Sequence, residues 1–187
     1  MQFPTDEQLV TRVLSGDRDA FRTLVERHYD AVYRLCYRVL CHRQDAEDAT
    51  QEAFVRACNA LPQYTGHGAF LAWLYRLTVN LCLNWRQSAA SRAAARSCSL
   101  DMFEESMVIS RDTPEETLLR ADRVQQIHQA LESLPAQQRT ALALRIMEEM
   151  SYEEIAQTMG VPVNSVKSWV HRARIHLRDV LEEKVLC

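Results

Sequence analysis

The chain has 187 residues, of which 47% are hydrophobic and 25% charged, and its formal net charge is −3. This composition excludes wholesale disorder and allows one domain of ordinary size or two small ones. The best membrane candidate, residues 71–83, is interrupted by Arg76 and Asn80 and falls short of the roughly 18 to 20 residues of a span. Because the N-terminus has no apolar signal region, we expect a cytoplasmic protein without membrane insertion.

Apolar residues recur at helical spacing along the first half, whereas strand-like alternation is nearly absent. Thr5 and Gln8 form a capping box at a helix start, and Asp17 can cap a second helix. The spacing predicts four helices, at roughly residues 5–15, 17–39, 44–60 and 69–87. A polar loop over residues 62–68 separates the last two. These patterns predict an all-α fold.

The composition changes at residue 88. Residues 88–113 are rich in Ser and Ala, then acidic, without an apolar period, which predicts a flexible linker. Thr113 and Pro114 are typical of a helix start. The apolar stripe of this helix consists of Leu118, Val124, Ile127 and Leu131. Pro135 opens a further helix, which contains Ala141, Leu142, Leu144 and Ile146. We expect two small helical domains, residues 1–88 and 114–187, joined by a linker over residues 89–113.

Residues 151–178 have the pattern of a helix-turn-helix. Ser151 and Glu154 form a capping box, and Gly160 supplies a tight turn where a positive φ costs little. The second helix, from Val163 onward, contains four Lys or Arg and no acid up to residue 178. Its expected exposed side chains are Asn164, Lys167, Ser168, His171, Arg172 and Arg174. Such side chains can reach base edges and phosphates in the major groove. The alternative is a solvated basic face without a ligand.

The acidic net charge of the chain argues against tight DNA binding by the helix-turn-helix alone. Phosphate attraction supplies most non-specific affinity for DNA, and the chain as a whole is acidic. We therefore expect weak DNA binding by the chain alone and a partner that brings more contacts.

A second stripe lies on the predicted helix over residues 69–87. Trp73, Arg76 and Asn80 follow one another at spacings of three and four, close to Tyr64 in the preceding loop. Aromatic rings can stack on unpaired bases, an amide can read a base edge, and an arginine can hold a phosphate. The residues alone fit core packing of Trp73 with solvent exposure of its neighbours equally well.

Several segments in order resemble the bacterial extracytoplasmic function (ECF) sigma factors, which are RNA polymerase subunits. The similar segments are residues 17–21 (DRDAF), 45–54 (DAEDATQEAF), 70–80 (FLAWLYRLTVN), 134–139 (LPAQQR), 151–156 (SYEEIA) and 166–174 (VKSWVHRAR). The resemblance covers nearly the whole chain, and its motifs are specific as a set. Trp169 and His171 depart from the residues common in the family and leave the exact DNA sequence open.

The resemblance implies a non-enzymatic transcription initiation subunit with no cofactor or metal. Its implied partners are core RNA polymerase, through the β′ clamp helices and the β subunit, promoter DNA and an anti-sigma factor. Residues expected to contact the clamp helices are Asp48, Gln51 and Glu52. Residues expected at the minus-ten element, where a base is flipped out, are Arg56, Ala60, Tyr64, Trp73, Arg76 and Asn80. The exposed helix-turn-helix residues would read the minus-thirty-five element, and the linker would thread into the polymerase.

Two other classes compete with this interpretation. A helix-turn-helix regulator that acts without polymerase would bind an operator directly, commonly as a dimer. An enzyme would need a catalytic constellation, and His28 with Asp30, which we expect on a solvated helix face, is a poor candidate.

The cysteines, at positions 36, 41, 58, 82, 98 and 187, are expected to be free thiols, because the cytosol is reducing. A metal cluster of Cys36, Cys41, His42 and Cys58 is the alternative, although its spacing matches no zinc pattern. The cysteines also permit, without favouring, a response to oxidation.

Overall fold

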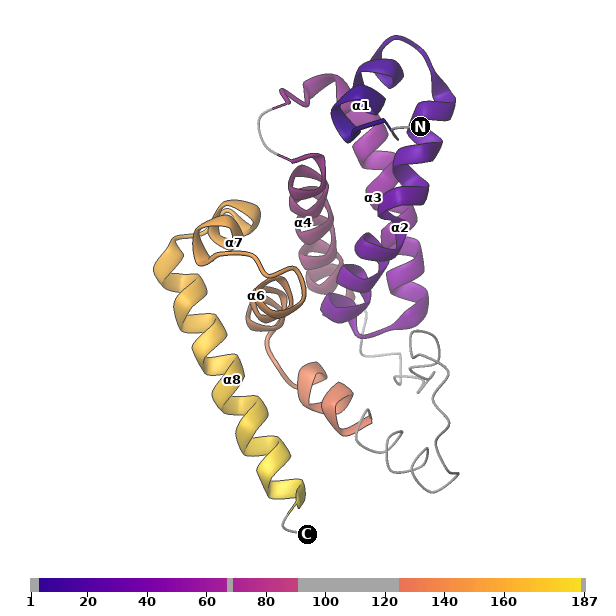
Figure 1. Cartoon of the computed structure of the whole chain (residues 1–187). Coiled ribbons are helices and arrows are strands. Elements are labelled where there is room, and N and C mark those ends of the chain that lie inside the picture. Colours follow the sequence, from indigo (N-terminus) through magenta and orange to yellow (C-terminus); the bar gives the residue numbers. More distant parts are fainter. Residues whose placement is uncertain (1–3, 67–68, 91–124, 186–187) are drawn as a thin grey trace, which may run out of the picture.

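The computed structural model describes residues 4–66, 69–90 and 125–185, and all regular secondary structure in these ranges is helical. The elements are α1 (Asp6–Leu14), α2 (Arg18–Leu40), α3 (Arg43–Ala60), the 3-10 turn η1 (Leu61–Gln63), α4 (Phe70–Ala90), α6 (Ala136–Met147), α7 (Tyr152–Met159) and α8 (Val163–Val185). Residues 125–132 form one more, unlabelled helix (Figure 1). The all-α prediction is confirmed for the described residues.

The first four helices pack into one unit, in which α2 contacts α1, α3 and α4 (Figure 1). The apolar side of α2 is buried as predicted, with Leu24, Val32 and Leu35 at 1% exposure or less. Facing it, α3 presents the small side chains of Ala46, Ala49 and Ala53, so the two helices approach closely. This packing, rather than helix propensity, supplies most of the stability of such helices.

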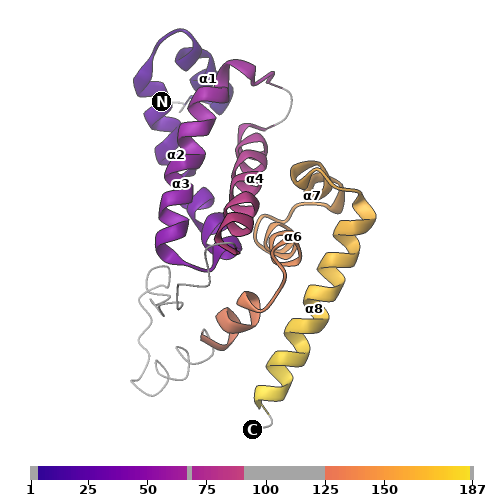
Figure 2. The ribbon, with the colours of Figure 1, turned by 180° about the vertical axis from the view of Figure 1, so that it is seen from behind.

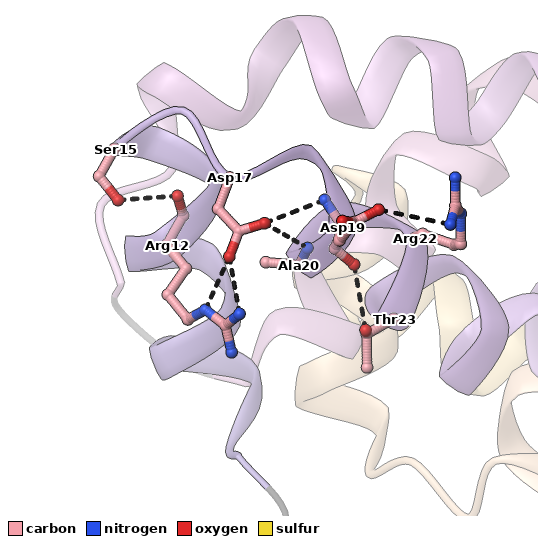
Figure 3. Close-up of polar contacts among 7 residues, drawn as sticks. All are labelled: Arg12, Ser15, Asp17, Asp19, Ala20, Arg22 and Thr23. Carbon is pink, nitrogen blue, oxygen red and sulfur yellow. Dashed lines mark hydrogen bonds and ion pairs between the residues drawn. The ribbon is translucent and has the colours of Figure 1, made fainter.

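Local capping sets the corner between α1 and α2 (Figure 3). Gly16 turns the chain with a φ of 101°, and one carboxylate oxygen of Asp17 accepts hydrogen bonds from the backbone N–H groups of Asp19 and Ala20 at 3.0 and 3.2 Å. The other accepts from Arg12 Nε and Nη2 at 3.0 and 2.7 Å. The hydrogen bond from Arg12, followed by the bond to Ala20, lowers the pKa of Asp17. The DRDAF segment thus has a structural role: it begins α2.

The second unit consists of α6, α7 and α8, with α8 packed on both others. Ser151 and Glu154 close the predicted capping box at the start of α7. Gly160 ends α7 with a φ of 67°, the left-handed conformation predicted for this turn. Val166 and Val170 lie on the inner face of α8 and are buried, at 0% and 1% exposure. The predicted helix-turn-helix is therefore present.

Two expectations about burial are wrong. His28 is only 7% exposed, and its Nε2 lies 2.9 Å from Asp6 Oδ2 on α1. Ile127, expected on the apolar stripe of its helix, is 45% exposed. Helical periodicity identifies an apolar stripe but does not say how much of it the neighbouring helices cover. The other residue of the predicted pair, Asp30, is exposed as expected.

Several predicted features fall at the edge of the described residues or beyond it. The first residues of the predicted linker, 89–90, belong to α4, which continues to Ala90. The helix start at Thr113 and Pro114, together with Leu118 and Val124, lies outside the described residues. So do Cys98 and Cys187. Across residues 4–66, 69–90 and 125–185, every helix is too short or too polar to span a bilayer.

The two units touch, which the sequence did not indicate. The helices α6 and α7 lie between α4 and α8 in both views (Figures 1 and 2). Helix α6 packs on α2 and α4, and α7 packs on α4. The outer face of α8 points away from the first unit (Figure 2).

Candidate nucleic-acid interface

Three aromatic rings form a cluster where the loop after η1 meets the start of α4. The ring of Phe70 is buried, at 1% exposure, and supports the half-buried rings of Tyr64 and Trp73. Ring centroids are separated by 5.1 Å between Tyr64 and Trp73, and by 5.9 and 5.6 Å from Phe70 to each of them. Burial, with smaller contributions from Glu7 and Asp6, raises the pKa of Tyr64. The cluster is a preformed apolar surface that still reaches solvent.

Arg76 and Asn80 continue this surface along α4. Both are exposed, and they follow Trp73 at spacings of three and four, so the three residues share one face. The sequence alone did not decide whether Trp73 packs in the core or stacks on a base. The structure shows that one side of the ring packs while the residue keeps access to solvent, so the two interpretations are compatible. A half-buried ring is held in place before any base arrives, which reduces the entropy cost of stacking.

Arg56 and Ala60 lie on the last turns of α3, next to η1. Ala60 is half-buried and directly precedes the buried Leu61. Arg56 is exposed, and its Nε donates to Glu52 Oε1 at 2.8 Å. Glu52 belongs to the set predicted to bind polymerase, so this ion pair joins the two predicted sets on one helix. An exposed pair at this spacing contributes only about 0.3–0.5 kcal/mol, so its role is to orient Arg56.

The predicted polymerase-binding residues share the outer face of α3. Asp48 and Gln51 are exposed and Glu52 is half-exposed, whereas the neighbouring Ala49 and Ala53 are buried. The helix begins with the His42 side chain as its cap, since Nδ1 accepts from the backbone N–H of Asp45 at 3.2 Å. This cap was not predicted, because His is not a common N-cap residue.

The predicted reading residues of α8 form one solvent-facing surface. Asn164, Lys167, His171, Arg172 and Arg174 are exposed, and Ser168 is half-buried. Trp169, which departs from the family pattern, is half-buried and packs against the core. Trp169 therefore contributes to the attachment of α8. The surface contains no acid, so it suits a phosphate backbone.

Lys167 and Arg145 approach the ring of Tyr152 from α8 and α6. Arg145 Cζ lies 5.2 Å and Lys167 Nζ 6.0 Å from its centroid. Arg145 is fixed by a 2.8 Å hydrogen bond from Nη1 to the carbonyl of Met150. Cation–π contacts of this length restrict where the cations can point. Sequence reasoning missed Tyr152 and Arg145, because they lie on different helices from the reading residues.

The four described cysteines, Cys36, Cys41, Cys58 and Cys82, do not form part of a metal site. Among the described residues, no three His, Cys, Asp or Glu side chains lie close enough to hold an ion, so the alternative cluster around Cys36 and Cys58 does not form. Cys58 is exposed, whereas Cys36 and Cys82 are buried with their Sγ atoms 3.7 Å apart. The Cys82 thiol lowers the pKa of Cys36, and the same contact together with burial raises the pKa of Cys82.

Each of the two helical units matches a known protein family. Residues 24–92 match the family described as Sigma-70 region 2, and residues 124–177 match the family described as Sigma-70, region 4. The first match includes the aromatic cluster of Tyr64, Phe70 and Trp73. A regulator that acts without polymerase would require only the second.

Similar proteins match over nearly the whole chain. The RNA polymerase sigma-H factor of Pseudomonas aeruginosa is 37% identical over 181 residues, covering 95% of this chain and 94% of the relative. The ECF RNA polymerase sigma-E factor of Escherichia coli K12 is 37% identical over 185 residues, covering 97% and 94%. The ECF RNA polymerase sigma factor SigW of Bacillus subtilis is 32% identical over 179 residues, covering 93% and 95%.

Two solved structures have a similar fold. The sigma factor RpoE from Bartonella quintana, in complex with the anti-sigma factor NepR, gives a TM-score of 0.70 at 20% identity and covers 87% of this chain and 96% of its own. CnrH, in complex with the cytosolic domain of CnrY, gives a TM-score of 0.67 at 25% identity, with coverages of 96% and 99%.

Proposed function

The chain belongs to the ECF RNA polymerase sigma factors and directs RNA polymerase to promoters, and we propose that three separate surfaces share this work. The family is non-enzymatic, so each surface acts by binding. The observation that carries the division is the difference between the aromatic cluster on α4 and the acid-free basic face of α8. The first suits unpaired bases and the second suits duplex DNA.

The outer face of α3 binds the clamp helices of the polymerase β′ subunit through Asp48, Gln51 and Glu52. Support comes from their shared exposure on one face, with small buried alanines behind them. Val55 follows Gln51 and Glu52 on the same face and is 55% exposed, so this surface combines polar side chains with one apolar side chain. The second domain, residues 114–187 in our assignment, contacts the β subunit, and the linker over 89–113 passes into the polymerase between the two.

The minus-ten surface consists of the aromatic cluster with its polar neighbours. Trp73 and Tyr64 stack on bases, Asn80 hydrogen-bonds to the edge of a flipped base, and Arg76 and Arg56 hold phosphates. Ala60 borders the same pocket and leaves room for the base. Capturing a flipped base offsets an unpairing cost of a few kcal/mol, so binding energy is used to open the duplex.

The minus-thirty-five surface is the exposed face of α8. Lys167 and Arg172, together with Asn164, Ser168, His171 and Arg174, contact the major groove and its phosphates. The acidic net charge of the chain explains why this face alone gives little affinity. Core polymerase supplies the remaining contacts.

An anti-sigma factor is a further partner in this proposal. The similar sigma factor RpoE was solved bound to the anti-sigma factor NepR, and the fold of the two sigma chains is shared. We extend this type of partner to the present chain. Co-purification of a protein that abolishes promoter activity when it is added to the chain and core polymerase would test this proposal.

Promoter opening tests the function directly. The chain is mixed with core polymerase and promoter DNA, and unpaired thymines are mapped with permanganate. We expect opening only when both proteins are present, and a reduction of about tenfold or more with Asn80→Ala. Gln137→Ala removes an equally exposed amide away from the three surfaces and serves as the matched control. DNA binding by the chain alone, unchanged by polymerase, would contradict the proposal.

A further inference from the structure

His28 on α2 is a buried polar residue outside the three proposed binding surfaces. It is 7% exposed, and its Nε2 lies 2.9 Å from Asp6 Oδ2 on α1. Because an ionised carboxylate only accepts hydrogen bonds, Nε2 carries a proton and donates to it. Burying an imidazole N–H costs free energy unless it is hydrogen-bonded, so the ring is stable in this position while α1 supplies the carboxylate. Helix α1 thus fixes the orientation of the His28 ring.

The fixed ring of His28 lies against the ring of Phe70 on α4. The two centroids are 5.6 Å apart, and the ring planes are inclined at 45°. Phe70 in turn is the buried ring on which Tyr64 and Trp73 pack, with centroids 5.9 and 5.6 Å away. One series of contacts therefore leads from Asp6 on α1 to the two rings that we propose to stack on bases.

Helix α1 also reaches the minus-ten surface directly. It contacts η1, the turn that precedes Tyr64, as well as α2. After burial, the negative charges of Glu7 and Asp6 are the causes that raise the pKa of Tyr64, so both carboxylates lie near its ring. Carboxylates repel phosphates, so α1 contributes support for the aromatic cluster instead of a DNA contact.

We propose that His28, held by Asp6, is a positioning residue that fixes the Phe70 ring beneath the minus-ten surface. It acts on DNA only through the aromatic cluster. Rings that are held in place before a base arrives lose less entropy on stacking, so loss of His28 should weaken the capture of unpaired bases. Binding to polymerase and to the minus-thirty-five duplex should not change. This inference rests on the proposed function.

His28→Ala tests the positioning role, with Arg27→Ala as its matched control. Arg27 precedes His28 on α2 and also binds the start of α1, since Nη1 lies 2.6 Å from Asp6 Oδ1 and Nη2 donates to the carbonyl of Pro4 at 2.9 Å. Both variants therefore remove a contact between α1 and α2. Only His28 has a described contact with the Phe70 ring.

Fluorine NMR of the full chain, labelled with fluorinated tryptophan, reports on the cluster without polymerase or DNA. The chain has three tryptophans, and Trp73→Phe assigns the resonance of Trp73. We expect His28→Ala to shift or broaden this resonance and to leave those of Trp85 and Trp169 in place. Arg27→Ala should leave all three unchanged.

Titration of the holoenzyme measures the consequence for DNA. We expect His28→Ala to raise the dissociation constant for a single strand carrying the minus-ten element by about threefold to tenfold. The constant for a duplex carrying only the minus-thirty-five element should stay the same. Asp6→Ala releases the imidazole without removing it and should give a smaller loss in the same direction. Asp6→Asn keeps an accepting oxygen for Nε2 and should restore most of the binding.

Three results would overturn the proposal. An unmoved Trp73 resonance in His28→Ala would show that the cluster does not depend on His28, and a moved resonance with normal single-strand binding would remove its role on DNA. Equal losses in Arg27→Ala would indicate a general loosening of α1. If His28→Ala does not fold, Asp6→Ala and Asp6→Asn give the same comparison. If the parent holoenzyme fails to bind the strand, the proposed function fails, while the NMR comparison still decides whether His28 positions the cluster.

Discussion

The two proposed DNA-binding surfaces of this sigma factor are built in opposite ways. In the first domain the proposed reading residues come from a loop and two helices, and their rings are half-buried around Phe70. In the second they lie on one face of α8, and almost all are exposed. Unpaired bases require an apolar surface already in place, whereas an intact major groove requires polar side chains that reach out of a rigid helix. Under the proposed assignment, core packing and DNA reading are therefore coupled in the first domain and separable in the second.

The largest effect is expected where packing and reading coincide. Phe70→Ala should lower the free energy of unfolding by about 3–5 kcal/mol, because it leaves a cavity beneath Tyr64 and Trp73. Promoter opening should fall with it. Urea denaturation of the full chain, followed by permanganate mapping under conditions where the variant is folded, measures both. A stable variant that opens promoters normally would show that the cluster does not support the minus-ten surface.

A smaller effect is expected where reading is independent of packing. Lys167→Ala should leave stability nearly unchanged but weaken holoenzyme binding to duplex DNA by about 1–3 kcal/mol if it contacts a base. If it contacts a phosphate instead, the slope of binding against salt should decrease by about one. Titration of a labelled duplex over several salt concentrations separates the two cases. No change in either quantity would remove Lys167 from the surface.

Removal of a helix cap should affect duplex binding in the second domain but not in the first. Ser151→Ala removes the side chain that accepts from the Glu154 N–H at 3.1 Å, and should cost about 1 kcal/mol of stability while loosening the helix-turn-helix. Thr5→Ala removes the equivalent capping box of α1 and should cost a similar amount. Only Ser151→Ala should weaken duplex binding. Equal losses of duplex binding in the two variants would indicate a general stability effect instead.

The smallest effect is expected at the corner in Figure 3. Asp17→Asn keeps a good N-cap but loses the charge that pairs with Arg12. Because the folded pKa of Asp17 is lowered, its stabilisation is present at neutral pH and is lost as the pH falls through that folded value. The difference between variant and parent should therefore be slight at neutral pH and vanish in acid. Thermal unfolding across this range measures it, and a difference that grows in acid would contradict the sign.

Local features could be predicted from the sequence, because their partners are close in the chain. The caps at Thr5, Asp17 and Ser151 and the turn at Gly160 are confirmed, and each depends on residues at most five positions away. The exposed face of α8 could also be predicted, since its basic residues recur at helical spacing without any acidic residue among them. Exposure is observed at these residues, whereas their roles on DNA stay predictions.

Features that join distant segments could not be predicted. His28 looked solvated because its partner, Asp6, is 22 residues away on α1. The hydrogen bond from Tyr75 to Glu148 joins residues 73 positions apart, and nothing in either local pattern indicates that the domains touch. Ile127 was misplaced because periodicity does not reveal which part of an apolar stripe the neighbouring helices cover. A single sequence gives the faces of helices but not their neighbours.

The most direct test of the division of work between the two surfaces measures how two variants of the assembled holoenzyme bind two different DNA probes. Asn80→Ala and Lys167→Ala are each titrated with two labelled probes, a single strand carrying the minus-ten element and a duplex carrying only the minus-thirty-five element. The account predicts that Asn80→Ala weakens binding of the single strand alone and that Lys167→Ala weakens binding of the duplex alone. Loss of both probes in both variants, or an exchange of the two effects, would contradict the division of work between α4 and α8.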